Sequence, residues 1–133
     1  MGFEDLAKLA VDCGFRLHKE IGPGLFESVY ETLLAEALRE RGLSVERQVS
    51  VPIRYGKLVV DNAFRVDLLV ERVLVIELKS TERDSALYAK QLLTYLRLMN
   101  LPLGLLMNFG QETFKQGIQR VVNNHRETAQ QAS

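Results

Sequence analysis

The spacing of apolar residues divides the chain into a helical part, a stretch of strands and a second helical part. In residues 4–21, apolar side chains recur at steps of three and four, which predicts an amphipathic helix. Gly22-Pro23-Gly24 ends this helix, because glycine suits a helix cap and proline cannot continue a helix. The same period predicts a second helix from about Leu25 to Arg41, with Gly42 just beyond its end.

After Gly42 the pattern changes to the two-residue period of strands. Residues 45–51 alternate, and residues 53–60 read as a hairpin with its turn at Gly56. Two further runs rich in strand-forming residues, Phe64–Val70 and Leu74–Lys79, are separated by the charged pair Glu71-Arg72.

The second helical part begins near Asp84 and continues to about Met99. Leu103–Asn108 is nearly all apolar, as expected of a strand covered on both faces. We expect a last helix over Thr113–Asn123 and a polar, flexible tail over 124–133. This order predicts the α/β class, with a mixed central sheet flanked by helices in a single domain over 1–123.

Composition adds few constraints. A chain of 133 residues with 47% apolar residues is long enough for one domain with a core. Seventeen basic and seventeen acidic residues cancel, which argues against an extensive basic surface but leaves room for a local basic groove. The single cysteine, Cys13, is expected to be a small buried residue. No apolar run reaches 18 residues and the acidic start lacks a signal-peptide core, so we expect no membrane contact and a cytoplasmic location.

Two acids lie inside runs that otherwise look like buried strands. Asp67 is flanked by Val66 and Leu68, and Glu77 precedes Leu78 and Lys79. Burying a carboxylate without a partner costs several kcal/mol, so something should compensate it. Residues two apart in a strand share a face, which puts Glu77 and Lys79 about 6–7 Å apart. If Asp67 lies opposite Glu77, two carboxylates and an ammonium group converge.

A divalent cation would relieve the repulsion between two such carboxylates. Ligands that are all oxygen atoms suit magnesium or manganese better than zinc. With Asp67, Glu77 and the main-chain carbonyl of Leu78 as ligands, the chemistry that fits is phosphodiester hydrolysis. Lys79 would orient the attacking water or stabilise charge on the phosphate. Taken singly, a strand aspartate is better explained as an edge or turn-proximal residue, and a Glu-x-Lys pair as a solvated ion pair. Two such features on adjacent apolar strands make the site and the surface explanation about equally good.

Other residues extend this site. Gln91 and Tyr95 are four residues apart on one helix face, where Gln91 could bind a metal-bound water or phosphate and Tyr95 the substrate backbone. Taken alone, a core-facing Tyr with a Gln at the rim explains the pair better. Glu27 opens the second helix, where it also complements the helix dipole, and as a third acid it would complete the metal shell directly or through water. Candidate phosphate contacts, each also explicable as solvated surface charge, are Arg54, Lys57, Arg65, Arg83, Lys90 and Arg97; we single out Arg65, Lys90 and Arg97.

Several ordered motifs together resemble a known group. The segment Gly24-Leu25-Phe26-Glu27-Ser28-Val29-Tyr30 fits the pattern that names the GxxExxY protein family. The likeness extends over about residues 14–122. It includes the segments His18–Gly24, Arg65–Val70, Ile76–Lys79, Gln91–Leu96 and Gly104–Phe109.

The resemblance implies a PD-(D/E)XK nuclease fold with an α-β-β-β-α-β core. By resemblance, Asp67 and Glu77 take the two acid positions and Lys79 the lysine. Glu27 looks like the acid on a helix before the sheet, and Gln91 with Tyr95 looks like a Gln-x-x-x-Tyr motif. Val66 stands where the name of the superfamily has proline, a position that supplies only backbone.

Three functions follow from this reading. The first is a magnesium- or manganese-dependent nuclease acting on DNA or RNA. The second is an inactive nucleic-acid-binding module on the same fold. The third is a structural or interaction subunit, which would be favoured if a dimer partner covered the face that bears these residues. The sequence is also compatible with a homodimer.

The proposed site depends on one detail of strand pairing. A two-residue turn at Glu71-Arg72 would place Asp67 and Glu77 on opposite faces of the sheet. Asp67 and Glu77 share a face only if the connection has an odd number of residues, as in a three-residue turn over residues 71–73, or if a bulge lies nearby. A left-handed conformation is unfavourable for the β-branched Val73, so we expect a bulge or a strained Arg72.

Overall fold

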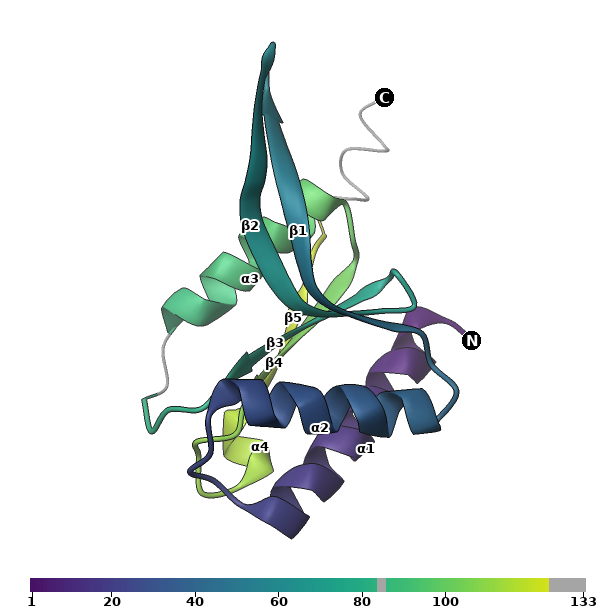
Figure 1. Ribbon diagram of the computed structural model, residues 1–133, viewed down its shortest axis with the longest axis vertical. Helices are drawn as coiled ribbons and strands as arrows, with labels where there is room; N and C mark the ends of the chain where they lie inside the picture. Colours follow the sequence, from purple (N-terminus) through teal and green to yellow (C-terminus); the bar gives the residue numbers. More distant parts are fainter. Residues whose placement is uncertain (84–85, 125–133) are drawn as a thin grey trace.

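A curved five-stranded sheet forms the centre of the computed structural model, which describes residues 1–83 and 86–124 (Figure 1). Its strands follow in the order β1-β2-β3-β4-β5. Only β3 and β4 are parallel, and the other neighbours are antiparallel, so the sheet is mixed. The strands are β1 (Val45–Tyr55), β2 (Leu58–Val70), β3 (Leu74–Lys79), β4 (Leu103–Asn108) and β5 (Ile118–Val122).

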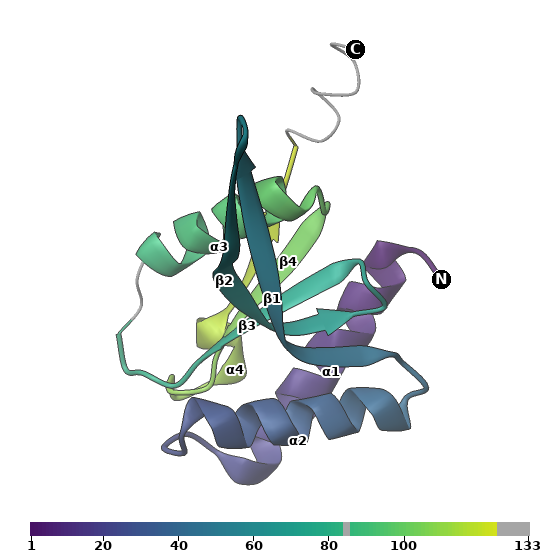
Figure 2. The same ribbon diagram turned by 45° about the horizontal axis from the view of Figure 1, so that its top comes forward.

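Helices cover both faces of the sheet. Figure 2 shows α1 (Phe3–Ile21) and α2 (Glu27–Glu40) on one side and α3 (Ala86–Met99) on the other. The apolar side chains form two matching clusters, one between the sheet and the first two helices, the other between the sheet and α3. The cost of ordering the chain is offset mainly by burying these two layers. None of the described helices is long and apolar enough to cross a membrane.

The predicted fold class is confirmed, and most predicted elements lie within a few residues of their expected bounds. The expected start of the third helix at Asp84 lies outside the described residues. The same holds for positions 125–133 of the expected tail.

The prediction of a last helix over Thr113–Asn123 is wrong. Only α4 (Phe114–Gly117) is helical, and residues 118–122 form β5, which pairs antiparallel with β4. Gly117 lies so close to the main chain of Asn108 that an added Cβ would be 2.0 Å from the Asn108 carbonyl oxygen. Two features favour the strand. The β-branched residues of this segment suit extended backbone, and pairing with β4 satisfies the hydrogen-bonding groups along its otherwise open edge.

The turn between β2 and β3 has the odd register that the site required. Leu68 pairs with Ile76 and Val70 with Leu74, so the connection contains three residues. Glu71 and Arg72 both take the left-handed conformation, with φ of 53° and 55°. Val73 does not take the left-handed conformation, and its N–H donates to the Val70 carbonyl at 3.1 Å. The two strained residues, Glu71 and Arg72, are not β-branched, and a strained Arg72 was one of the two outcomes predicted from the sequence.

Strand β2 changes sides near Asp67. Leu68 packs in the cluster under α1 and α2, whereas Val66 packs in the cluster under α3. Residues two apart in a regular strand share a face, so the strand must turn over between them. On β1, Arg47 pairs with Leu68 and Val49 with Val66, and Gln48 between them takes a left-handed φ of 50°. From this point the β1–β2 hairpin leaves the body of the protein as a long arm (Figure 1).

Candidate metal and phosphodiester site

The candidate site lies where β2 and β3 separate. Their pairing ends at Leu68 and Ile76, although β3 continues to Lys79 and β2 extends back to Leu58. Beyond this point, β2 stays with β1 while β3 stays with β4. The separation leaves a wedge between the two strands, and backbone groups inside it lack their usual partners on the opposite strand.

Two carboxylates fill this wedge, each bound to the opposite strand. The Asp67 N–H donates to Glu77 Oε1 at 3.0 Å, and the Leu78 N–H donates to Asp67 Oδ2 at 2.8 Å. The side chains therefore replace the missing ladder bonds. The same contacts bring Asp67 and Glu77 together on one side of the sheet, as the sequence predicted.

Burial makes this pair electrostatically costly. Glu77 is only 8% exposed. Burial, followed by the negative charge of Asp67, raises the pKa of Glu77 to about 8. The N–H of Asp67 and the charge of Lys79 act in the opposite direction and are weaker. Near neutral pH the pair therefore holds a proton, unless another positive charge takes its place.

Lys79 is positioned by β3 and α3. It lies two residues after Glu77, hence on the same face of the strand. Its Nζ is 4.5 Å from the centre of the Tyr88 ring, which gives the ammonium group an aromatic neighbour on α3. The lysine is half-buried, so its amine is held near the acids while it remains accessible.

Helix α3 closes one side of the site with Tyr95. Its ring stacks on Phe64 with the centres 4.2 Å apart. Burial, then the charge of Glu77 and that of Asp67, raises the pKa of the Tyr95 phenol. The phenol thus lies in the field of both acids. Gln91 is one turn earlier on the same helix and is exposed.

The acid that connects α2 to the site is Glu31, which sequence reasoning missed. Glu31 is buried and forms an ion pair with the Arg47 Nε at 3.0 Å. Gln48 Nε2 donates both to Glu31 and to Asp67 Oδ1, the latter at 3.1 Å. Glu31 lies four residues after Glu27 and so on the same helical stripe, which is the signal that would have revealed it. Glu27 itself is exposed at the first residue of α2.

The donor set fits a hard divalent cation only in part. Within residues 1–83 and 86–124, no three side chains of His, Cys, Asp or Glu gather as metal ligands. Glu27 therefore does not join Asp67 and Glu77 in this structure. The two carboxylates nevertheless offer oxygen ligands whose mutual repulsion a cation would relieve, which is the chemistry that magnesium and manganese require.

Tyr30, the last residue of the Gly-x-x-Glu-x-x-Tyr segment, has a structural role. It is fully buried and stacks on Phe109, with ring centres 4.6 Å apart. Its hydroxyl donates to the Gly22 carbonyl at 2.6 Å and accepts from the Leu25 N–H at 3.2 Å. These bonds fix the loop that leads into α2 and so determine where Glu27 begins the helix.

Comparison with known proteins identifies the family of this chain. The profile of the PD-(D/E)XK nuclease superfamily matches residues 4–121. The chain belongs to the PD-(D/E)XK nuclease superfamily. In a PD-(D/E)XK protein, the mixed sheet with helices on both faces is the expected core, so the fold predicted from sequence agrees with the structure.

A solved relative supports the PD-(D/E)XK fold. The crystal structure of a protein named SSO0001 is similar, with a TM-score of 0.54 and 22% sequence identity. The likeness covers 73% of this chain and 50% of that one, so the chain spans about half the length of SSO0001. At this identity the likeness concerns the fold alone. No curated protein matches the sequence.

Proposed function

We propose that this protein is a metal-dependent nuclease that hydrolyses phosphodiester bonds of DNA or RNA. The observation that supports it most is the buried pair of Asp67 and Glu77 in the wedge between β2 and β3. Packing alone would favour apolar residues there, since burying two acids together is costly. Perturbed acids of this kind are typical of functional sites.

Each residue of the site has a proposed role. Asp67, Glu77 and the main-chain carbonyl of Leu78 would hold magnesium or manganese, with Glu27 contributing through water. When bound, the cation supplies stabilisation of charge on the phosphate and lowers the pKa of the attacking water. Lys79 lies beside the acids and donates hydrogen bonds to the water or to the phosphate oxygens.

Helix α3 would orient the substrate. The amide of exposed Gln91 donates or accepts at the attacking water, and the Tyr95 hydroxyl contacts the substrate backbone. Arg65 on β2 and Lys90 and Arg97 on α3 are exposed and would contact phosphates. The positions of Gly24, Glu27 and Tyr30 support assignment to the GxxExxY family within the superfamily.

An inactive nucleic-acid-binding module is the second candidate. One observation favours it: the described part of the chain gathers no third acidic, histidine or cysteine ligand beside the pair. In that case Asp67 and Glu77 would serve only to close the wedge in the sheet.

Cleavage assays distinguish the two candidates. Single- and double-stranded DNA and RNA are incubated with magnesium or manganese, beside a chelator control. We expect metal-dependent cleavage that Asp67→Asn, Glu77→Gln and Lys79→Ala each abolish, because each removes a ligand or the donor. We expect Gln91→Ala to slow cleavage. The exposed acid on α2, Glu36→Gln, is the matched control and should cleave like wild type. Nucleic-acid binding without cleavage under any metal would favour the second candidate.

A further inference from the structure

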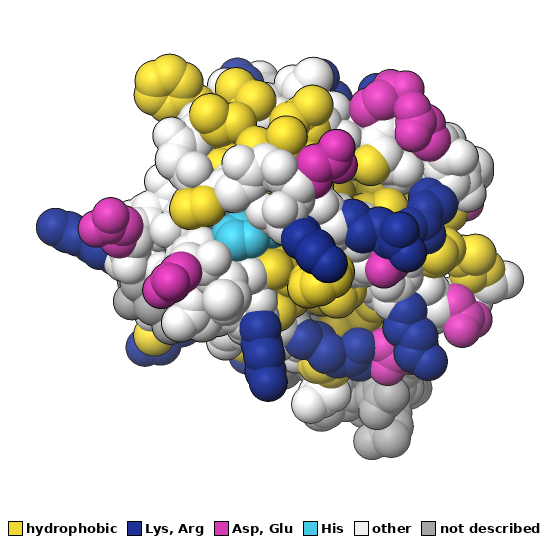
Figure 3. Space-filling view, turned by 90° about the horizontal axis from the view of Figure 1, so that it is seen from below, with side chains coloured by type: hydrophobic (Ala, Val, Ile, Leu, Met, Phe, Trp, Pro, Cys, Tyr) yellow, Lys and Arg dark blue, Asp and Glu magenta, His cyan; other side chains and the backbone are white. Residues whose placement is uncertain are grey.

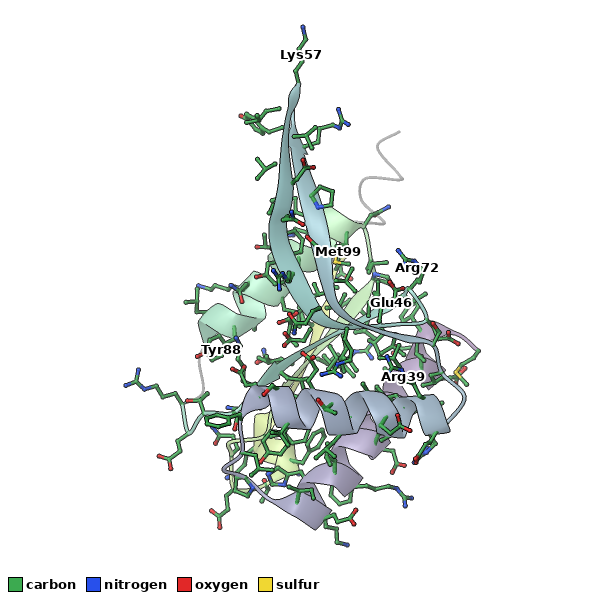
Figure 4. All side chains as sticks on the ribbon, viewed as in Figure 1. Arg39, Glu46, Lys57, Arg72, Tyr88 and Met99 are labelled. Atoms are coloured by element: carbon green, nitrogen blue, oxygen red, sulfur yellow. The ribbon has the colours of Figure 1, made fainter. Side chains whose placement is uncertain are left out.

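Gln48 on β1 lies directly opposite Asp67 on β2. The residue pairs on either side of this level keep one register, so these two residues face each other across the hairpin. Opposite residues of an antiparallel pair have neighbouring side chains. The same level is where the arm leaves the body of the protein, and Figure 4 shows the arm running outward to Lys57 at its tip.

The backbone of Gln48 is strained. Its φ of 50° lies in the left-handed region, which residues with a side chain rarely adopt. Strain of this kind persists only where the surrounding structure imposes it, and it is frequent beside functional sites. The residue is exposed, so burial of its side chain does not impose the strain. The contacts of its amide group therefore become the feature to explain.

The amide of Gln48 joins two acids on different elements. Its Nε2 donates to Glu31 Oε1 on α2 and, at 3.1 Å, to Asp67 Oδ1 on β2. An amide nitrogen carries two hydrogens, and an ionised carboxylate only accepts, so both hydrogens are engaged and the amide has one orientation. Gln48 thus connects the candidate site to α2.

Glu31 fixes the position of this amide. It is 6% exposed, and its second oxygen accepts from Arg47 Nε at 3.0 Å. The guanidinium of Arg47 also donates to the Thr32 hydroxyl at 2.9 Å. Charge-assisted bonds of this kind are short and directional. The buried acid on α2 therefore holds the Gln48 amide in place from the side away from Asp67.

Both carboxylate oxygens of Asp67 are held by this arrangement. Oδ1 accepts from Gln48, and Oδ2 accepts from the Leu78 N–H at 2.8 Å. The last torsion of an aspartate side chain is broad, so one donor leaves the plane of the carboxylate free to turn. Two donors, from the strands on both sides of β2, fix that plane.

We propose that Gln48 is a positioning residue: held by Glu31, it orients the Asp67 carboxylate for metal binding. This role rests on the proposed function, because the cation belongs to that proposal. Gln48 acts only through Asp67 and is not itself a ligand. Hydrogen bonds to the ligands of a metal commonly set their orientation and strengthen binding.

The metal-free protein tests the positioning by itself. Gln48→Met keeps the length of the side chain without its donor, whereas Gln48→Gly also relieves the left-handed strain. We expect both variants to shift the NMR resonance of the Leu78 amide proton, because Asp67 links Leu78 to Gln48. The Phe109 N–H donates to the Lys79 carbonyl at the end of the same strand and should keep its resonance.

Calorimetry with manganese tests the consequence for metal binding. We expect the affinity of Gln48→Met and of Gln48→Gly to fall by about tenfold, as for the loss of other hydrogen bonds to metal ligands. Gln119→Met, at an exposed glutamine of β5, is the matched control and should bind like wild type. Circular dichroism checks that each variant folds.

Several results would overturn the proposal. One is an unchanged Leu78 resonance, and another is an equal shift at Leu78 and Phe109, which would indicate a general loosening of the strand. A shift shown by only one of the two Gln48 variants would assign the effect to the backbone. Unchanged manganese affinity would also overturn it. A wild type that binds no manganese would refute the proposed metal site instead, and the Leu78 resonance would then decide whether Gln48 positions Asp67.

Discussion

Glu77 is the residue at which packing and the proposed chemistry conflict. Its burial and its neighbour Asp67 raise its pKa to about 8, so near neutral pH the cation-free protein retains a proton there. Binding a cation to this pair would displace that proton, because both favour the same oxygen atoms. Metal affinity and stability should therefore both depend on pH through this one group.

We expect the affinity for magnesium or manganese to rise by about tenfold per pH unit from about pH 6 to about pH 8, since one proton is released per ion bound. Isothermal titration calorimetry in two buffers of different ionisation enthalpy measures both the affinity and the proton release. Glu77→Gln should bind weakly and without this slope. Equal binding by wild type and variant would refute the site.

Stability of the metal-free protein should fall as pH rises. The pKa of Glu77 is about 8 in the folded state, against 4.5 for the ordinary group, so the folded state holds the extra proton between these values. The free energy of unfolding should decrease by about 3 kcal/mol from about pH 5 to about pH 8, relative to Glu77→Gln. Urea unfolding of both proteins at each pH measures the difference. A parallel pH dependence of the two would contradict the raised pKa.

Sequence reasoning at this scale identified the two acids and Lys79 because each broke the apolar pattern of a strand. It missed Gln48 and Glu31, since their link to Asp67 depends on a left-handed residue in β1 and on the packing of α2 against the strand. The left-handed residue leaves no periodic trace in the sequence, and the packing of α2 leaves only the four-residue spacing from Glu27 to Glu31.

Among the elements, the connections decide where the site residues point. The sequence could show which register of β2 and β3 the site requires, because a one-residue slip moves every side chain to the other face. It could not show that the strands adopt this register. The last helix could not be predicted correctly. Phe114, Ile118 and Val121 satisfy a helical period, and only the open edge of β4 makes a strand of residues 118–122.

The loop before α2 depends on one hydroxyl group. Tyr30→Phe removes the bonds to the Gly22 carbonyl and the Leu25 N–H, both in a buried setting. We expect a loss of about 1–2 kcal/mol in the free energy of unfolding, measured with urea. Tyr55→Phe, at an exposed tyrosine of the arm, is the control and should change stability little. Equal stability of Tyr30→Phe and wild type would show that the loop is fixed by other contacts.

Over the whole molecule, basic and acidic residues are equal in number. Figure 3 shows Lys and Arg side chains among Asp and Glu on the face seen from below, which agrees with seventeen residues of each sign. A phosphate path should therefore be local, as proposed for Arg65, Lys90 and Arg97, and binding should depend less steeply on salt than it does for proteins with a broad basic surface.

We also propose that residues 1–123 form the complete folding unit. A chain ending at Asn123 keeps the side-chain bond from Asn123 to the Leu101 carbonyl, at 3.1 Å. It should unfold in one transition, with a free energy within about 0.5 kcal/mol of the full chain. Denaturant unfolding followed by circular dichroism measures this. A large loss of stability would place the last residues inside the fold.

The wedge between β2 and β3 has a consequence for hydrogen exchange. The amides of Asp67 and Leu78 are held by carboxylate oxygens, whereas their neighbours in the sheet are held by carbonyls. A carbonyl keeps its acceptor strength across the neutral pH range, but a carboxylate loses part of its strength when it takes up a proton. Protection of the Asp67 amide, which Glu77 accepts, should therefore follow the ionisation of Glu77, so this one backbone position would report the charge state of the site without any substrate.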